Sequence, residues 1–189
     1  MDEELNFDTL AVRAGIERSQ FGENSEALFL NSSFRFKNAA QAAARFGGTE
    51  PGNIYSRFTN PTVTMLQNKL AALEGAEQCV ATSSGMAAIL ACVMGLCNSG
   101  DHVVASRALF GSNYQVITGI LPRFGIGYSL VDGNDAAAWR AAMTAKTKCV
   151  FIETPSNPLL EVVDIAMVAE IAHGAGARLI VDNQNAEIL

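Results

Sequence analysis

From residue 60 onwards, short apolar runs alternate with segments in which apolar residues recur at helical spacing. The short runs predict strands at residues 79–83, 101–106, 126–131, 149–152 and 179–181. The helical spacing predicts helices at residues 61–73, 85–97, 112–123, 136–143 and 164–173. Strands that alternate with helices in this way predict a mostly parallel sheet covered on both faces, which is an α/β fold.

Three of these helices have a distinctive arrangement of apolar residues, and for two of them it predicts burial. The helix that begins at Asn60-Pro61 places four apolar residues on one face, Val63, Leu66, Leu70 and Leu73. The helix at 164–173 directs another four inward, Ile165, Val168, Ala169 and Ala172. The segment 85–97 is apolar all round, so we expect it to be buried on all sides.

The first 60 residues lack this regular pattern. They contain two possible short helices, at 7–14 and 39–46, and a turn-rich loop at 47–52. We therefore expect residues 1–60 to form an arm that packs on something else, and residues 61–189 to form the regular α/β domain.

Composition excludes several function classes. The 189 residues are 49% apolar with a net charge of −6, and no basic cluster occurs, so a nucleic-acid surface is not expected. No apolar run reaches the roughly 18 residues that a membrane span needs, and the acidic N-terminus is not a signal peptide. We expect a cytoplasmic protein that acts on a small molecule.

The four cysteines, Cys79, Cys92, Cys97 and Cys149, form no C-x-x-C pair, and only two histidines are present. A metal site is therefore not expected. Each cysteine lies in an apolar run, which favours buried free thiols in a reducing compartment. His102 opens a strand and His173 ends a helix, and both fit structural roles better than a Cys–His nucleophile.

Candidate chemistry gathers where the strands end. Polar residues follow them at 83–85, 106, 153–157 and 182–183, and the carboxyl ends of parallel strands are where such sheets bind ligands. In the turn before the apolar helix, Ser84 can cap the first turn and Gly85 allows close approach of a ligand. This turn suits a phosphate, although an ordinary helix cap is the better explanation when the turn is taken alone.

Four segments in order carry a family resemblance: Tyr55-Ser56-Arg57, Ser84-Gly85-Met86, Thr154-Pro155-Ser156-Asn157-Pro158 and Val181-Asp182-Asn183. Together they resemble the transsulfuration group, the cysteine and methionine metabolism family of pyridoxal-phosphate (PLP) enzymes, from about Phe7 to Asn183. The resemblance implies the large domain of a fold-type I PLP-transferase, with a mostly parallel sheet in an α/β/α arrangement, here truncated to its N-terminal half. It also implies that the arm reaches a neighbouring subunit's site.

The family assigns the residues as follows. Ser84, Gly85 and Met86 would hold the PLP phosphate, Phe110 would stack on the ring, Asn157 would bind the phenolic oxygen, and Asp182 would face the pyridine nitrogen. Tyr55 and Arg57 would reach the phosphate in the neighbouring subunit, which implies a homo-oligomer: a dimer with shared sites, and a tetramer in the full-length family. Taken singly, Asp182 could cap the next segment, Asn157 could be a turn residue, and Tyr55 and Arg57 could be surface residues.

Two departures from the family pattern matter. Most members carry Tyr where Phe110 stands, and Phe followed by Gly111-Ser112 is more similar to the sulfhydrylase branch that uses O-succinylhomoserine. The Ser-x-Thr-Lys segment that supplies the Schiff-base lysine and the small C-terminal domain are both absent, and no lysine (Lys37, Lys69, Lys146, Lys148) lies in a matching segment. We therefore assign no catalytic residue to this chain. We also expect the strands at 79–83 and 178–182 to lack a neighbour, and the helix at 85–97 to lose its cover.

The resemblance implies γ-replacement on an acylated homoserine, with O-succinylhomoserine and sulfide giving homocysteine in methionine biosynthesis. Cystathionine γ-synthase or γ-lyase activity stays open as an alternative. A catalytically dead truncated chain is the alternative from another class. An unrelated nucleotide-binding α/β module would require G-x-G-x-x-G or a Walker loop, and the sequence has neither.

Overall fold

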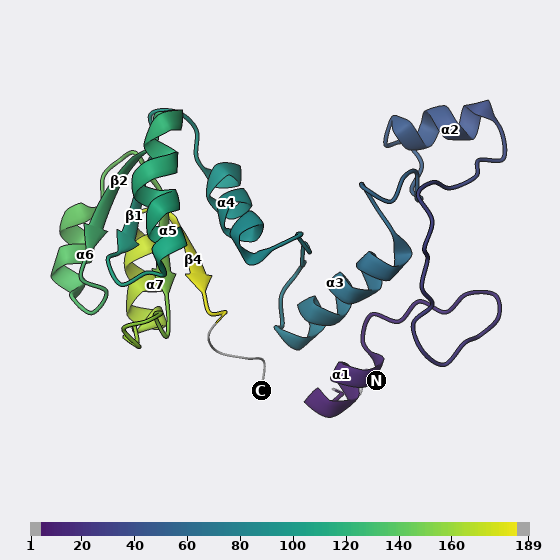
Figure 1. The fold of residues 1–189 in the computed structure, drawn as a ribbon, viewed down its shortest axis with the longest axis horizontal. Helices are drawn as coiled ribbons and strands as arrows, with labels where there is room; N and C mark the ends of the chain where they lie inside the picture. The colour runs from purple at the N-terminus through teal and green to yellow at the C-terminus, as the bar shows by residue number, and fades with distance from the viewer. Residues whose placement is uncertain (1–4, 185–189) are drawn as a thin grey trace. The chain divides into compact units, whose positions relative to one another are not determined.

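The computed structural model describes residues 5–184, and the chain divides into two compact units (Figure 1). One unit runs up to Ala81 and the other begins at Thr82. The division therefore lies beyond residue 60, so that the helix starting at Pro61 belongs with the N-terminal residues. Each unit is described by itself.

Residues 5–81 of the N-terminal unit contain three helices, α1 (Phe7–Arg13), α2 (Ala39–Phe46) and α3 (Pro61–Leu73), which confirm the predicted positions. α1 packs against α3. Gly15, just after α1, has a φ of +74°, and a Cβ there would lie 2.5 Å from the Met65 carbonyl oxygen. Only glycine permits both this backbone conformation and this approach to α3.

The start of α3 is as predicted. Asn60 caps the helix through its side chain, which accepts a hydrogen bond from the Thr62 amide, and Pro61 occupies the first turn. Met65 and Ala71 are the buried residues, whereas Val63 and Leu66 are 42% and 50% exposed. Within this unit α3 therefore buries the side that carries Met65 and Ala71, and leaves Val63 and Leu66 exposed.

The described part of the C-terminal unit, residues 82–184, contains four parallel strands in the order β2-β1-β3-β4, which confirms the parallel α/β prediction. The strands are β1 (His102–Ser106), β2 (Gly127–Val131), β3 (Thr147–Glu153) and β4 (Arg178–Asp182). β1 and β3 are central and almost wholly buried, as their apolar runs require. All four carboxyl ends therefore lie along one edge of the sheet.

Helices cover both faces of this sheet, giving three layers (Figure 1). One face carries α4 (Gly85–Leu96) and a continuous helical run that comprises α5 (Gly111–Gln115), a π-helix η1 (Val116–Ile120) and a 3₁₀ helix η2 (Leu121–Phe124). The other face carries α6 (Ala136–Ala142) and α7 (Ile165–Gly174). In α7, Val168 and Ala172 are buried as expected, but Ile165 is 45% exposed at the first turn.

Trp139, the single tryptophan of the chain, lies on α6. It is fully buried in the core cluster on the α6–α7 face, with Val104 and Val150 of the sheet. Its indole N–H donates to the Gly133 carbonyl at 3.0 Å. A buried indole thus has its only polar atom satisfied.

The predicted strand at 79–83 is wrong: these residues form no strand in the described structure. Their apolar character suits a strand, but a strand exists only through hydrogen bonds to a neighbour. β4 likewise pairs with β3 on one side only among the described residues.

The prediction that α4 is buried on all sides is also wrong. Ile89 and Val93 are buried against the sheet, but Ala91 and Cys92 are exposed and Leu96 is 37% exposed. The helix has one covered face because the described chain supplies packing on one side only. The prediction that all four thiols are buried holds for Cys97 and Cys149 only: Cys92 lies on the uncovered side of α4, and Cys79 is half-buried in the segment that forms no strand. No helix between residues 5 and 184 is long and apolar enough to span a bilayer.

Candidate cofactor-binding site

The turn before α4 has the capped geometry expected from its sequence. The Ser84 hydroxyl accepts a hydrogen bond from the Ala87 amide at 3.2 Å, and Gly85 is the first residue of the helix. A Cβ at Gly85 would lie 3.2 Å from the side-chain oxygen of Gln184. The Met86 side chain packs against the core cluster beneath α4. The N–H groups of the first turn have no partner within a helix and lie at its positive end, so they suit an anion.

Asp182 ends β4 and is only 9% exposed. One carboxylate oxygen, Oδ2, accepts from the Asn113 amide at 2.7 Å, and the other, Oδ1, accepts from the Gln184 backbone N–H at 3.2 Å. A buried carboxylate held in this way suits a cationic ligand, since burial of an unpaired charge is costly.

Gly85 and Asp182 line the same cavity, of about 250 Å³, between α4 and β4. Its walls are mostly apolar, and its remaining lining residues are Ala88, Ile89, Cys92, Phe151, Ile180, Val181, Asn183 and Gln184. The cavity therefore joins a helix N-terminus, which attracts anions, to a buried carboxylate, which attracts cations.

A second buried carboxylate, Glu153, lies at the end of β3 and is fully buried. Its Oε2 accepts from the Phe110 backbone N–H at 2.6 Å and from the Asn113 side-chain amide at 3.1 Å. Its Oε1 accepts from the Asn157 backbone N–H at 2.8 Å. Glu153 thus ties the start of α5 to the loop that follows β3.

Phe110 and Asn157 are brought to this edge of the sheet through Glu153. Phe110 precedes α5 and is 36% exposed, and Asn157 is exposed in the loop after β3. With Asp182 joined to the same network through Asn113, three of the predicted site residues are linked by hydrogen bonds to two shared side chains.

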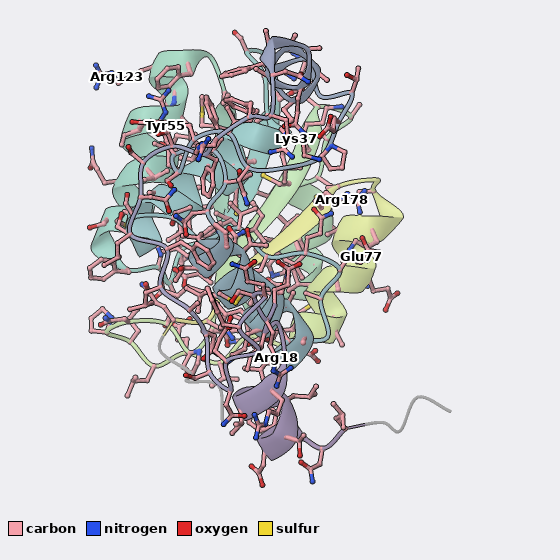
Figure 2. The ribbon with its side chains drawn as sticks, turned by 90° about the vertical axis from the view of Figure 1, so that its right-hand side faces the viewer. Arg18, Lys37, Tyr55, Glu77, Arg123 and Arg178 are labelled. Carbon is pink, nitrogen blue, oxygen red and sulfur yellow. The ribbon has the colours of Figure 1, made fainter. Side chains whose placement is uncertain are left out.

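Tyr55 and Arg57 belong to the N-terminal unit, where Figure 2 labels Tyr55. Tyr55 forms an antiparallel bridge with Ser33, and the Arg57 guanidinium lies 5.6 Å from the centre of the Tyr55 ring and 5.1 Å from that of Phe58. Both are exposed, so the guanidinium retains donors for another ligand.

Asn113 is the site residue that the sequence analysis missed. It is fully buried on α5, and its Oδ1 has no hydrogen-bond partner in the described part of the chain. One signal in the sequence could have indicated this residue: Asn113 lies on the same helical face as Val116 and Ile117, which are buried. A polar side chain on a buried apolar face indicates a specific hydrogen-bonding partner. Residues 5–184 contain no group of three acidic, cysteine or histidine side chains suited to a metal ion.

The sequence and the fold are both similar to those of known proteins. The sequence matches the family described as Cys/Met metabolism PLP-dependent enzyme over residues 8–187. It is 59% identical to an O-succinylhomoserine sulfhydrylase of Pseudomonas aeruginosa over 177 residues, which are 94% of this chain and 44% of the relative. An L-methionine gamma-lyase of Treponema denticola is 38% identical over 96% of this chain and 46% of its own length. The chain thus spans less than half the length of these relatives.

Solved structures of related enzymes have the same fold as this chain. A protein described as an O-acetylhomoserine (thiol)-lyase from Campylobacter jejuni, which carries N'-pyridoxyl-lysine-5'-monophosphate, superposes with a TM-score of 0.91 at 34% identity, over 95% of this chain and 45% of that one. Cystathionine gamma-lyase from Lactobacillus plantarum gives a TM-score of 0.86 at 32% identity, over 97% and 46%. The predicted resemblance and truncated fold-type I architecture are confirmed, and the chain belongs to the Cys/Met metabolism PLP-dependent enzyme family.

Proposed function

We propose that this chain forms the PLP-binding part of an enzyme that replaces the γ-substituent of an acylated homoserine. O-succinylhomoserine and sulfide would be the substrates and homocysteine the product, as the name of the Pseudomonas aeruginosa relative suggests. The observation that carries the proposal is the cavity that joins the N-terminus of α4 to Asp182.

The residues of this cavity fit PLP. The cofactor carries a phosphate and a pyridinium in one molecule, and the cavity offers helix amides for an anion and a carboxylate for a cation. When bound, PLP supplies a protonated ring that takes up the electron pair left when the substrate loses a proton. The absence of a Cβ at Gly85 leaves backbone room at the phosphate end.

Each residue then has a role that its position supports. Ser84, Gly85 and Met86 bind the phosphate through the first turn of α4. Asp182 keeps the ring nitrogen protonated, because a carboxylate beside a cation favours the charged form. Phe110 stacks on the ring and Asn157 binds its phenolic oxygen. Phe110 has no hydroxyl, so it cannot move protons as a tyrosine could.

Residues 1–60 are proposed to act in trans. The exposed Arg57, held beside the Tyr55 and Phe58 rings, would bind the phosphate in a neighbouring subunit. The protein would then be a homodimer with shared sites, and a tetramer when assembled fully. The four free cysteines favour a cytoplasmic location.

Cofactor binding can be tested without the Schiff-base lysine. Pyridoxine 5'-phosphate has no aldehyde, so its binding to the purified chain depends only on the phosphate and ring contacts. We expect Asp182→Asn to weaken this binding about tenfold or more, because it removes a charged partner. The control is Asp164→Asn, the same change at an exposed carboxylate that caps α7. Equal binding by wild type and Asp182→Asn would contradict the assignment of Asp182.

Activity assays separate the alternatives. Homocysteine from O-succinylhomoserine and sulfide supports the proposal. Cystathionine from O-succinylhomoserine and cysteine supports a γ-synthase. Methanethiol from methionine supports the γ-lyase named in the relatives. A chain that binds pyridoxine 5'-phosphate but turns over none of these would be the catalytically dead alternative. Reading the gene downstream of codon 183 for Ser-x-Thr-Lys in any frame would then show whether the lysine is encoded.

Subunit sharing has its own test. An equimolar, refolded mixture of Arg57→Ala and Asp182→Asn chains would contain mixed dimers in which one site has both Arg57 and Asp182 intact. We expect a class of tight pyridoxine 5'-phosphate sites that neither variant shows alone. If mixing restores no tight sites, Arg57 serves its own subunit or none.

A further inference from the structure

The end of β3 carries a carboxylate to which the proposed function gives no role. Glu153 is fully buried, and it accepts hydrogen bonds from two segments that are more than 40 positions apart in the chain, at Phe110 and Asn157. A buried glutamate is costly unless its oxygens are hydrogen-bonded, so its presence needs a reason.

We propose that Glu153 is the positioning residue of the cofactor site: its carboxylate sets the backbone of Phe110 and Asn157, and through Asn113 it sets the carboxylate of Asp182. This inference rests on the proposed function, because Phe110, Asn157 and Asp182 are the groups assigned there to the cofactor ring. Glu153 itself does not contact the ligand.

The two carboxylate oxygens of Glu153 accept hydrogen bonds from different segments of the chain. Oε2 accepts from the Phe110 N–H at 2.6 Å and from Asn113 Nδ2 at 3.1 Å, which fixes the start of α5. Oε1 accepts from the Asn157 N–H at 2.8 Å, which fixes the loop after β3. Bonds from N–H groups to a buried carboxylate are among the stronger hydrogen bonds of proteins, so both segments are held firmly.

Asn113 extends this control to Asp182. Its Nδ2 donates one hydrogen to Glu153 and the other to Asp182 Oδ2, at 3.1 and 2.7 Å. Rotating the amide by half a turn would place Oδ1 against two carboxylates, so only one orientation is compatible with both neighbours. The buried Oδ1, which has no partner among the described residues, is the cost of that orientation.

Glutamine at position 153 provides a specific test. Phe110, Asn113 and Asn157 each direct an N–H donor at Glu153, and an amide can present only one oxygen to them. The oxygen should stay where two donors meet, at Phe110 and Asn113, and leave the Asn157 N–H facing an amide group. Glu153→Gln should therefore release the Asn157 loop and keep the start of α5.

The readout is amide hydrogen exchange in the full chain, together with binding of pyridoxine 5'-phosphate. We expect the Asn157 amide of Glu153→Gln to exchange about tenfold faster or more, with Val150 in β3 unchanged, and the dissociation constant of the probe to rise by a similar factor. Glu170→Gln, the same change at an exposed glutamate on α7, should alter neither.

Other outcomes overturn the inference. Unchanged exchange at Asn157 would show that Glu153 does not hold the loop, and equally faster exchange at Val150 would show a general structural role. If Glu153→Gln does not fold, Asn113→Leu leaves Glu153 in place: Asn157 should keep its protection while probe binding weakens, and wild-type binding in that variant would overturn the link to Asp182. If the wild-type chain does not bind the probe, the proposed function fails, and the exchange pattern still decides whether Glu153 positions this backbone.

Discussion

At the scale of single residues, burial changes the acid–base behaviour of one histidine of the sheet. His102 opens β1, with its ring nitrogens 3.0 Å from the Thr147 hydroxyl and 3.1 Å from the Ser129 hydroxyl. Burial lowers the pKa of His102 below its ordinary value of 6.5. The folded chain therefore resists protonation at a position where the unfolded chain accepts a proton.

This predicts a loss of stability in mild acid. Below pH 6.5 the unfolded state binds more protons at His102 than the folded state, so the free energy of unfolding falls as the pH falls through this range. Urea unfolding at about pH 7.5 and about pH 5.5 measures the drop, which should be smaller in His102→Gln. His173→Gln, the same change at an exposed histidine, should retain the wild-type drop. An equal drop in both variants would contradict the role of His102.

The thiols give a second prediction at this scale. Burial raises the pKa of Cys97 and of Cys149, whose sulfurs lie 3.8 Å apart, whereas Cys92 is exposed. A thiol-specific reagent should therefore modify Cys92 in the folded chain, and Cys97 and Cys149 only after unfolding. As the pH rises above 9.0, the unfolded chain loses thiol protons that the folded chain keeps, so stability should also fall there. Peptide mapping that finds Cys149 modified as fast as Cys92 would refute this.

At the scale of elements, side chains at the helix starts connect the sequence to the fold. Asn60 is only 7% exposed and does two things at once: its Oδ1 caps α3, and its Nδ2 donates to the Phe29 carbonyl at 2.9 Å and the Ser56 hydroxyl at 3.0 Å. The same residue therefore starts a helix and anchors the segment that carries Tyr55 and Arg57.

Two substitutions at Asn60 separate these roles. Asn60→Ala loses the cap and the anchor, and should reduce the stability of the N-terminal unit by about 1–3 kcal/mol. Asn60→Asp keeps the cap acceptor but cannot donate to Phe29, so its loss should be smaller and confined to the anchor. Denaturant unfolding followed by helical circular dichroism compares the two variants. Equal losses would mean that the cap contributes nothing.

Some elements of this fold could be predicted from the sequence alone, and others could not. Helices such as α7 and strands such as β1 were predictable because their local pattern and their contacts within this chain agree. The strand at 79–83 was not, because its formation depends on a neighbour rather than on its own residues. The site residues came from short motifs, whereas Asn113 lies in no motif and acts only through distant partners, Glu153 and Asp182.

At the scale of the whole molecule, the C-terminal unit presents apolar surface that its own elements do not cover. Cys92 and Leu96 are exposed on α4, and β4 has one unpaired edge in the part of the chain that the structure describes. Unpaired strand edges and contiguous apolar faces are common sites of association.

We therefore expect residues 1–189 on their own to bind an apolar dye and to associate with rising concentration. Leu96→Lys should reduce both, because it places a charge on the exposed face of α4. Val12→Lys makes the same change at a 60% exposed position on α1 and is the matched control. Sedimentation and dye fluorescence measure the effect, and a monomer that binds no dye at high concentration would contradict the expectation.

The location of Trp139 has a practical consequence for every such measurement. It is the single indole of the chain, and it reports on the environment between α6 and the sheet, in the unit that begins at Thr82. Tryptophan emission therefore reports the unfolding of that unit and does not report the unfolding of α1, α2 and α3 in the other unit. If emission and helical dichroism give different midpoints, the two units unfold separately, and no single free energy describes the chain.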